Sequence, residues 1–470
     1  MSQKIANLLM VSFNDNRSII PKYIKNNLAD YKVNLFVVTN KKNLSYDVKE
    51  RRPYYDSIFG KNLKNETEID VDVLMKMEYV KSEILEMYDR YRFFNNLTYF
   101  DNRIKLYNKQ LLFWYNYLIN NNISHIIIGN IPHLGFDYII YNLAKFLKIP
   151  ILLFYRIPVL PNKCVRFYVL EDLNKQLDET FLSIKKEPTS NLVDPDILAY
   201  LELRGEKKVK TFYGRADDLG GKITFKNIYN SISYRLNKKY KDFKNGKNFS
   251  SYLTILLNRS IRHIPKYNPY NSIMKKDNMN YIFMPLHFQP EASSAPLGGM
   301  FSDQVKILQC ILKELPKNYK VILKPHKLIG GHRQFFERYV NDDRVIFVNS
   351  SSDSWRLMKK SKAVVTISGT IGWEAVLNSI PVLIFGSIFY QNAPGVYKIK
   401  SSKDLKIALN NINNHKKSTE KELITYLSYL SRSTNKGWVD NRYGKLTSLS
   451  NKENIESQSK AILNFIKKYE

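Results

Sequence analysis

The sequence has little cysteine and no hydrophobic run long enough to cross a bilayer. Its two cysteines, Cys164 and Cys310, lie far apart and have no metal-ligand neighbours. Disulfide scaffolds and zinc sites need clustered cysteines, so this scarcity argues against both and indicates a reducing compartment. The N-terminal residues reach Asn and Asp too early for a signal peptide. We therefore predict a cytoplasmic protein.

Acidic residues are scarce relative to basic ones. The 470-residue chain has 73 Lys and Arg against 43 Asp and Glu, a formal net charge of +30. Such a field attracts polyanions, which include nucleic acid, anionic lipid headgroups, and nucleotide-activated or acidic sugars. No zinc-finger spacing, RNA-binding aromatic signature or compact arginine-rich arm accompanies the charge. We therefore predict no nucleic-acid partner.

Short apolar runs alternate with helical patterns in two separate parts of the chain, which an irregular basic region divides. This pattern predicts an α/β protein with two Rossmann-like domains that face each other across a cleft, joined by a helical basic insert. The predicted boundaries are residues 1–157 for the N-terminal domain, 158–280 for the basic linking region, 281–450 for the C-terminal domain, and 451–470 for a helix that packs back toward the N-terminal domain.

The basic region interleaves Tyr, Phe, Leu and Ile with Lys and Arg, most densely at residues 227–270. An amphipathic basic helix of this kind can lie on an anionic membrane surface. It can equally be a solvated helix face that covers a core. The first interpretation would place the protein peripherally at the inner face of the cytoplasmic membrane.

Residues 361–390, SKAVVTISGTIGWEAVLNSIPVLIFGSIFY, have the order strand, small-residue turn, helix, strand. In a parallel sheet, the turn Ser368, Gly369 and Thr370 lies at the carboxyl ends of the strands, where ligands bind. The following helix directs its positive N-terminal end at any phosphate there. Glu374, one helical turn further on, can reach a ribose hydroxyl. The alternative is an ordinary crossover with a serine N-cap.

Polar residues also follow the other predicted strands of this second part. A loop that only turned the chain would be shorter and richer in Gly, Asn and Pro. We therefore predict that this domain has the nucleotide-binding face. The residues are His287, Glu291 and Asp303 after the strand 281–285, Lys324 and His326 at the end of the strand 320–323, and Ser350 after the strand 345–348.

Several motifs together resemble bacterial capsule and surface-polysaccharide biosynthesis proteins. They are HFQPEASSAPLGG with a following DQ, LKPH, SGTIGWEA with its continuation SIPVLIFG, and, in the N-terminal half, PHLGFDYIIYNLAK. These proteins are similar to two-domain GT-B glycosyltransferases, particularly the Kdo and sialic-acid types that use CMP-sugars. Two features depart from those types: the His-Pro order appears here as Pro325-His326, and the paired acidic motif of bacterial sialyltransferases is missing.

The resemblance implies a nucleotide-sugar donor, CMP-linked, in the C-terminal domain and a glycan or lipid-linked acceptor on the N-terminal side. His133 and Asp137 then become candidate acceptor-side residues, although His133 can also cap the next helix. No Asp-x-Asp motif stands at a strand end, since residues 70–72 precede a helix. We therefore expect no cofactor and a metal-independent transfer.

In such a transfer, the growing negative charge on the leaving phosphate must be stabilised. Lys324, His326 and the turn 368–370 are suited to that task. Glu291 and Asp303 are the nearest candidates for a general base or nucleophile, and His287 can serve as a base or bind the sugar's carboxylate. Asp303 can instead cap the helix that begins there.

Other functions remain open at this point. A CDP-polyol phosphotransferase of the teichoic-acid type and a UDP-sugar epimerase share the two-domain plan. A catalytically silent polysaccharide-assembly protein would use the same fold only for binding. Fold alone does not separate these classes.

Overall fold

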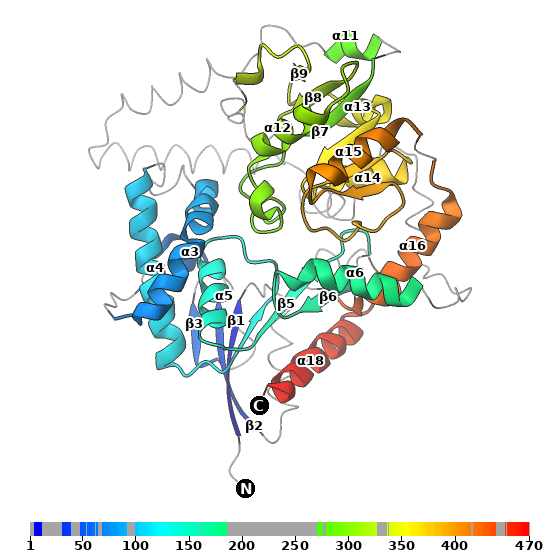
Figure 1. Cartoon of the computed structure of the whole chain (residues 1–470). Coiled ribbons are helices and arrows are strands. Elements are labelled where there is room, and N and C mark those ends of the chain that lie inside the picture. Colours follow the sequence, from blue (N-terminus) through cyan, green and yellow to red (C-terminus); the bar gives the residue numbers. More distant parts are fainter. Residues whose placement is uncertain are drawn as a thin grey trace, which may run out of the picture.

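The computed structural model describes a large part of the chain, arranged as two α/β domains (Figure 1). The described residues are 4–11, 31–38, 48–52, 54–61, 63, 68–91, 99–160, 162–185, 270–275, 279–326, 336, 338–414, 417–438, 447 and 449–469. The basic stretch 227–270, predicted as a membrane-binding or covering helix, lies outside them except for Tyr270. Within the described ranges, no helix is long and apolar enough to cross a membrane.

The N-terminal domain is built on one sheet with the strand order β13-β6-β5-β4-β1-β2-β3. The strands from β5 to β3 in this order are parallel, whereas β6 is antiparallel to β5 and β13 is antiparallel to β6. Their bounds are β1 Lys4–Val11, β2 Tyr31–Val38, β3 Glu50–Arg52, β4 His125–Ile128, β5 Ile151–Arg156, β6 Lys163–Phe167 and β13 Asn435–Lys436.

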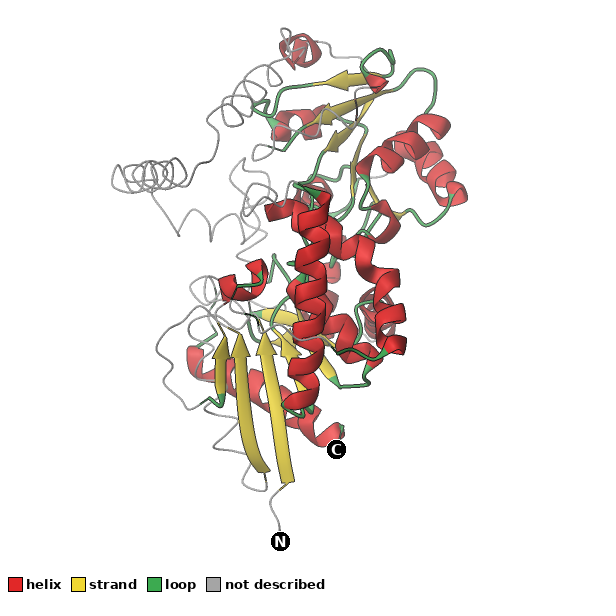
Figure 2. Cartoon of the chain, turned by 90° about the vertical axis from the view of Figure 1, so that its left-hand side faces the viewer, coloured by secondary structure: helices red, strands yellow, loops and turns green. Residues whose placement is uncertain are grey.

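Helices cover both faces of this sheet (Figures 1 and 2). Side chains alternate along a strand, so Leu9 faces the core under α3, α4 and α5, whereas Leu8 faces a core that includes Ile462 and Phe465 of α18. The helices of this half are α2 Tyr54–Phe59, α3 Val71–Met87, η2 Tyr88–Tyr91, α4 Phe100–Asn120, α5 Phe136–Phe146, α6 Asp172–Lys185 and, from the end of the chain, α18 Asn451–Lys468.

The C-terminal domain has a second, wholly parallel sheet with the order β12-β11-β10-β7-β8-β9. Its strands are β7 Tyr281–Pro285, β8 Lys320–Lys324, β9 Val345–Phe347, β10 Ala363–Thr366, β11 Val382–Ile384 and β12 Val396–Lys398. Its helices are α11 Tyr270–Lys275, η3 Gly299–Phe301, α12 Gln304–Glu314, α13 Ser354–Lys360, α14 Thr370–Leu377, α15 Ser402–Asn411, η5 Ile412–Asn414 and α16 Glu420–Ser433. Two separate sheets confirm the predicted α/β fold class.

The chain crosses back to the first domain earlier than residue 450. Helix α16 packs against α6, and β13 then pairs with β6, so the N-terminal sheet contains residues 435–436 and extends past residue 157. Arg166 fixes this return, because its Nη2 donates to the carbonyl oxygens of Lys436 and Ser457 at 3.0 and 3.1 Å. Helix α18 then packs Ile462, Phe465 and Ile466 against the first sheet.

Candidate functional site

The candidate site lies at the carboxyl edge of the C-terminal sheet, between β7 and β10. These strands are neighbours in the sheet, and the chain leaves β7 toward β8 and leaves β10 toward β11 on the opposite side. Such a reversal of strand order opens a crevice between the two outgoing loops. The loop after β7 and the turn after β10 therefore begin side by side.

His287 joins the two strand ends. Its backbone N–H donates to Gln304 Oε1 at 2.7 Å, which ties the loop to the start of α12. Its ring Nε2 accepts a hydrogen bond from the Ile367 N–H at 3.1 Å and lies 2.8 Å from Thr366 Oγ1. Because the Nε2 lone pair is engaged in this way, the geometry gives His287 a positioning part through that nitrogen.

The turn after β10 is closely packed around Gly369, the N-cap residue of α14. Gly369 N–H donates to Thr366 Oγ1 at 2.9 Å, and Tyr390 O–H donates to the Gly369 carbonyl oxygen at 2.6 Å. A Cβ added at Gly369 would lie only 2.7 Å from Thr366 Oγ1 and 3.0 Å from His287 Cε1. A larger residue would therefore displace the histidine.

No side chain caps the N-terminus of α14. The Ser368 hydroxyl donates instead to the Ser293 carbonyl oxygen at 2.7 Å, so it holds the loop after β7 against the turn. The serine-capped crossover considered for this segment is therefore not what the structure shows. The first helical turn, beginning at Thr370, follows the carboxyl end of β10, so the positive end of the helix dipole lies at that edge of the sheet.

Glu374 lies one turn into α14 and is largely buried. Burial alone raises the pKa of its carboxyl group to about 7. In the described part of the chain, no donor forms a hydrogen bond or ion pair with this carboxylate. A largely buried carboxylate without a partner is costly unless a ligand supplies donors.

The strand end of β8 lies next to that of β7. Lys324 is buried, and the ring of His326 lies 5.8 Å from the ring of Phe288, the residue after His287. Ser350 follows β9, the outermost strand on this side, so it lies two strands away from the crevice. The structure thus brings together Lys324 and His326 with the β7 loop, but not Ser350.

Asp303 has a structural contact. It is the N-cap of α12, and its Oδ1 accepts from the Val305 N–H at 3.0 Å. This is the capping alternative considered from the sequence.

Glu291, in the β7 loop, faces the N-terminal domain. Its side chain is 40% exposed, and Oε1 lies 4.0 Å from Arg90 Nη2 of η2. Burial raises the pKa of the Glu291 carboxyl group, whereas the positive charges of Arg90 and Arg156 oppose the shift. Gln289 forms a second contact, since its Nε2 donates to Glu86 Oε1 at 2.8 Å. The loop is therefore held between the two domains.

Sequence reasoning missed Arg90. Its Nη1 is buried and has no hydrogen-bond partner in the described part of the chain, and its guanidinium lies 5.9 Å from the centre of the Phe288 ring. In the sequence, Arg90 is one arginine in a helical stretch that contains no motif, so nothing there indicated a functional residue. Its arrangement leaves a donor available to an anionic group of a ligand.

The two acceptor-side candidates lie in the loop between β4 and α5. His133 Nδ1 is 2.6 Å from the Ile131 carbonyl oxygen, and burial lowers the pKa of the ring to about 4, so the imidazole is neutral at physiological pH. Asp137 is buried, and its Oδ1 accepts from the Leu134 N–H at 2.7 Å. Burial raises the pKa of Asp137 to about 6, although hydrogen bonds from backbone N–H groups have the opposite effect and lower it. Asp137 thus holds the loop, while His133 lies near Arg90.

This loop fits closely against η2. Gly135 has φ +84°, and a Cβ there would lie 2.2 Å from the ring of Tyr88. The glycine therefore lets η2, which carries Arg90, approach the loop that carries His133. In the described residues, no three His, Cys, Asp or Glu side chains converge to form a metal site.

The fold and the crevice define a two-domain protein of the GT-B type, with two Rossmann-like domains. Residues 218–434 match the family model of capsule polysaccharide biosynthesis proteins. This match confirms the resemblance to that family inferred from the sequence motifs. No curated protein sequence matches the chain.

The solved structures that match this chain share little sequence with it and have low TM-scores. The UDP-GlcNAc 2-epimerase from Methanocaldococcus jannaschii is 11% identical, with a TM-score of 0.28, over 91% of this chain and 98% of that one. The enzyme from Neisseria meningitidis, bound to UDP-GlcNAc, is 9% identical, with a TM-score of 0.28, over 99% and 100%. The β-Kdo 2,7-transferase KpsC from Thermosulfurimonas dismutans is 12% identical, with a TM-score of 0.30, over 67% and 88%.

Proposed function

We propose that the protein is a glycosyltransferase of capsular or other surface-polysaccharide biosynthesis that transfers a sugar from a CMP-linked donor to a glycan or glycolipid acceptor. The observation that carries the proposal is the start of α14 after β10, which no side chain caps and which is followed one helical turn later by the partnerless carboxylate of Glu374. Hydroxyl groups of a ribose would supply the donors that Glu374 lacks. The first turn of α14 would receive a phosphate.

In the proposed reaction, an acceptor hydroxyl oxygen attacks the anomeric carbon of the donor sugar. The bond between that carbon and the phosphate oxygen breaks, and its electron pair leaves with the CMP phosphate. Lys324 and His326 would stabilise the resulting charge. Glu291, whose pKa burial raises, would take the proton of the acceptor hydroxyl if configuration is inverted.

Arg90 would balance charge in this reaction. It lies beside Glu291 and Phe288, with one nitrogen that lacks a partner. An anionic group on the donor, either the phosphate or a sugar carboxylate, would complete its hydrogen bonds. His287 would keep the turn 366–369 in position rather than touch the sugar.

A thermal-shift panel with CMP, CDP, UDP and GDP tests the nucleotide. Stabilisation by CMP supports the proposal, because a ligand that binds only the folded state raises the melting temperature. Stabilisation by CDP would indicate a polyol-phosphate transferase, and stabilisation by UDP an epimerase or hexose transferase. No response to any nucleotide would indicate a silent assembly protein.

The expected independence from metal is tested separately. Turnover of the CMP-sugar should be unchanged after treatment with EDTA, because Lys324, His326 and the start of α14 would supply the positive charge. Activity that disappears with EDTA and returns with magnesium or manganese would contradict this part of the proposal.

A further inference from the structure

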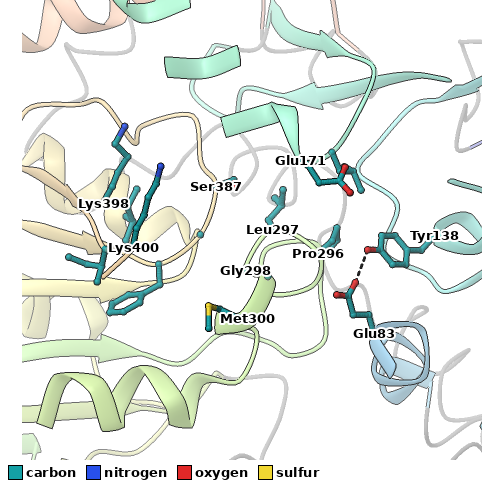
Figure 3. A pocket seen from close by; sticks show the side chains of 16 residues that line it. Glu83, Tyr138, Glu171, Pro296, Leu297, Gly298, Met300, Ser387, Lys398 and Lys400 are labelled. Carbon is teal, nitrogen blue, oxygen red and sulfur yellow. Dashed lines mark hydrogen bonds between the residues drawn. The ribbon is translucent and has the colours of Figure 1, made fainter. Parts of the chain in front are cut away.

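A cavity lined by residues of both domains lies between them (Figure 3). Its volume is about 410 Å³, within the range of sites that hold small molecules. Glu83, Tyr138 and Glu171 line it from the N-terminal domain, and Ser387, Lys398 and Lys400 line it from the C-terminal domain. None of these residues belongs to the crevice residues predicted from the sequence.

The cavity and the crevice share a wall. Gly386 N–H donates to the Ile367 carbonyl oxygen at 3.0 Å, and Ser387 N–H donates to the Leu297 carbonyl oxygen at 3.0 Å. Ile367 is also the residue whose N–H binds His287. A ligand in the cavity would therefore lie next to a donor held by the turn after β10.

Two of the four charged side chains in the cavity are neutralised by other residues of the chain. Glu171 Oε1 lies 2.6 Å from Lys145 Nζ, and Lys398 Nζ lies 2.8 Å from Asp178 Oδ1. These pairs keep polar oxygen and nitrogen atoms at the cavity but contribute little net charge.

The other two charged side chains, Glu83 and Lys400, line the cavity from opposite domains (Figure 3). Glu83 Oε2 accepts from the Tyr138 hydroxyl at 2.6 Å, which leaves its other oxygen for a ligand hydroxyl. Lys400 is exposed, and no carboxylate of the described residues lies within salt-bridge distance of its ammonium group. The side of the cavity formed by the N-terminal domain thus accepts hydrogen bonds, whereas the side formed by the C-terminal domain offers one positive charge.

We propose that this cavity binds a sugar unit of the acceptor glycan that carries a carboxylate. Its hydroxyl groups would donate to Glu83 and Glu171, its carboxylate would lie at Lys400, and Leu297 and Phe385 would contact the apolar face of the ring. A phosphate or nucleotide is less suited, because the described lining includes a single uncommitted cation and no arginine. This inference rests on the proposed glycosyltransferase function, which supplies the acceptor.

Saturation-transfer NMR on the full chain tests the proposal, with D-glucuronate, its methyl ester and D-glucose as probes. Glucuronate should bind about fivefold more tightly than the uncharged ester, as for one exposed charge pair. Lys400→Ala should remove that difference. Lys403→Ala, an exposed lysine of α15 that lies outside the cavity lining, makes the same change in charge and should preserve it.

A second variant, Ser387→Trp, would fill the cavity and should abolish binding of all three sugars while the melting temperature and CMP binding stay unchanged. Glucuronate that does not bind, or a preference that survives Lys400→Ala, would overturn the proposal. CMP binding separates the hypothesis of the cavity site from that of the glycosyltransferase function. If the protein binds glucuronate through Lys400 but binds no nucleotide, the cavity site stands and the proposed function is wrong.

Discussion

The candidate site has two walls, and in the C-terminal wall His287, Thr366 and Gly369 are linked by hydrogen bonds between adjacent strand ends. In the N-terminal wall, Arg90 of η2 lies beside Glu291 of the β7 loop, and its Nη1 has no partner in the described residues. The first wall is rigid before any ligand arrives, whereas the second gains hydrogen bonds only when one binds. We therefore expect the C-terminal wall to bind the nucleotide and to act on the reacting groups through Lys324, His326 and Glu291, and the N-terminal wall to bind an anionic group of the ligand through Arg90.

The sharpest test of the C-terminal wall is His326→Ala. If His326 stabilises the leaving phosphate, kcat should fall about a hundredfold or more, the loss found when one group that stabilises developing charge is removed. The measurement is CMP release from the donor at saturating concentrations. The melting temperature serves as the control for folding. An unchanged kcat would remove His326 from the proposed machinery.

The N-terminal wall is tested by Arg90→Ala. Losing a charge-assisted hydrogen bond to an anionic group should lower kcat/KM about tenfold. Arg90→Lys, which keeps the charge but not the planar fork, should recover part of that loss. Arg356→Ala, at an exposed arginine of α13, is the matched control and should have normal kinetics. Equal kinetics for Arg90→Ala and the control would show that the unpaired Arg90 nitrogen has no part in the reaction.

Glu374→Gln separates ligand binding from stability. The variant should bind CMP several-fold more weakly, since a neutral amide accepts a weaker hydrogen bond from a ribose hydroxyl than a carboxylate does. Isothermal titration calorimetry at pH 8, where the wild-type carboxyl group is ionised, measures this affinity.

The same variant should change how stability depends on pH. The folded protein raises the pKa of Glu374 from 4.5 to about 7, so between these values it binds more protons than the unfolded chain. Its free energy of unfolding therefore decreases as pH rises through this window and stays low above it. The melting temperature of Glu374→Gln minus that of wild type should therefore be larger at pH 8 than at pH 5. A difference that does not vary with pH would mean that the Glu374 carboxyl group is not perturbed.

The strands that end at the C-terminal wall could be predicted from the sequence because they are short apolar runs. The predicted strand 281–285 coincides with β7, and the end of β8 falls within one residue of the predicted strand 320–323. Strand ends in a parallel sheet gather at one edge, so local patterns were enough to place Lys324, His326 and Glu374 in one region.

The N-terminal wall could not be predicted in the same way. The position of Arg90 depends on how η2 packs against the loop at Gly135 and on how the domains meet, and neither leaves a local pattern. The pairing of β13 with β6 joins two residues to a strand some 270 positions earlier in the chain, and the Arg166–Lys436 contact spans the same separation. Hydrophobic periodicity is a local signal, so it does not detect such a long-range pairing. The link from His287 to Ile367 likewise exists only in the folded sheet.

The smallest effect should follow changes at Asp303, which belongs to the rigid wall but caps a helix. Because its Oδ1 accepts from the Val305 N–H, Asp303→Ala should lower the free energy of unfolding by about 1 kcal/mol, as for other N-cap losses. Asp303→Asn keeps an oxygen that can cap the helix, so its stability should stay near wild type. Both variants should keep the wild-type kcat under conditions in which they are folded. A large fall in kcat for Asp303→Asn, with stability intact, would instead identify Asp303 as the general base and leave Glu291 without that role.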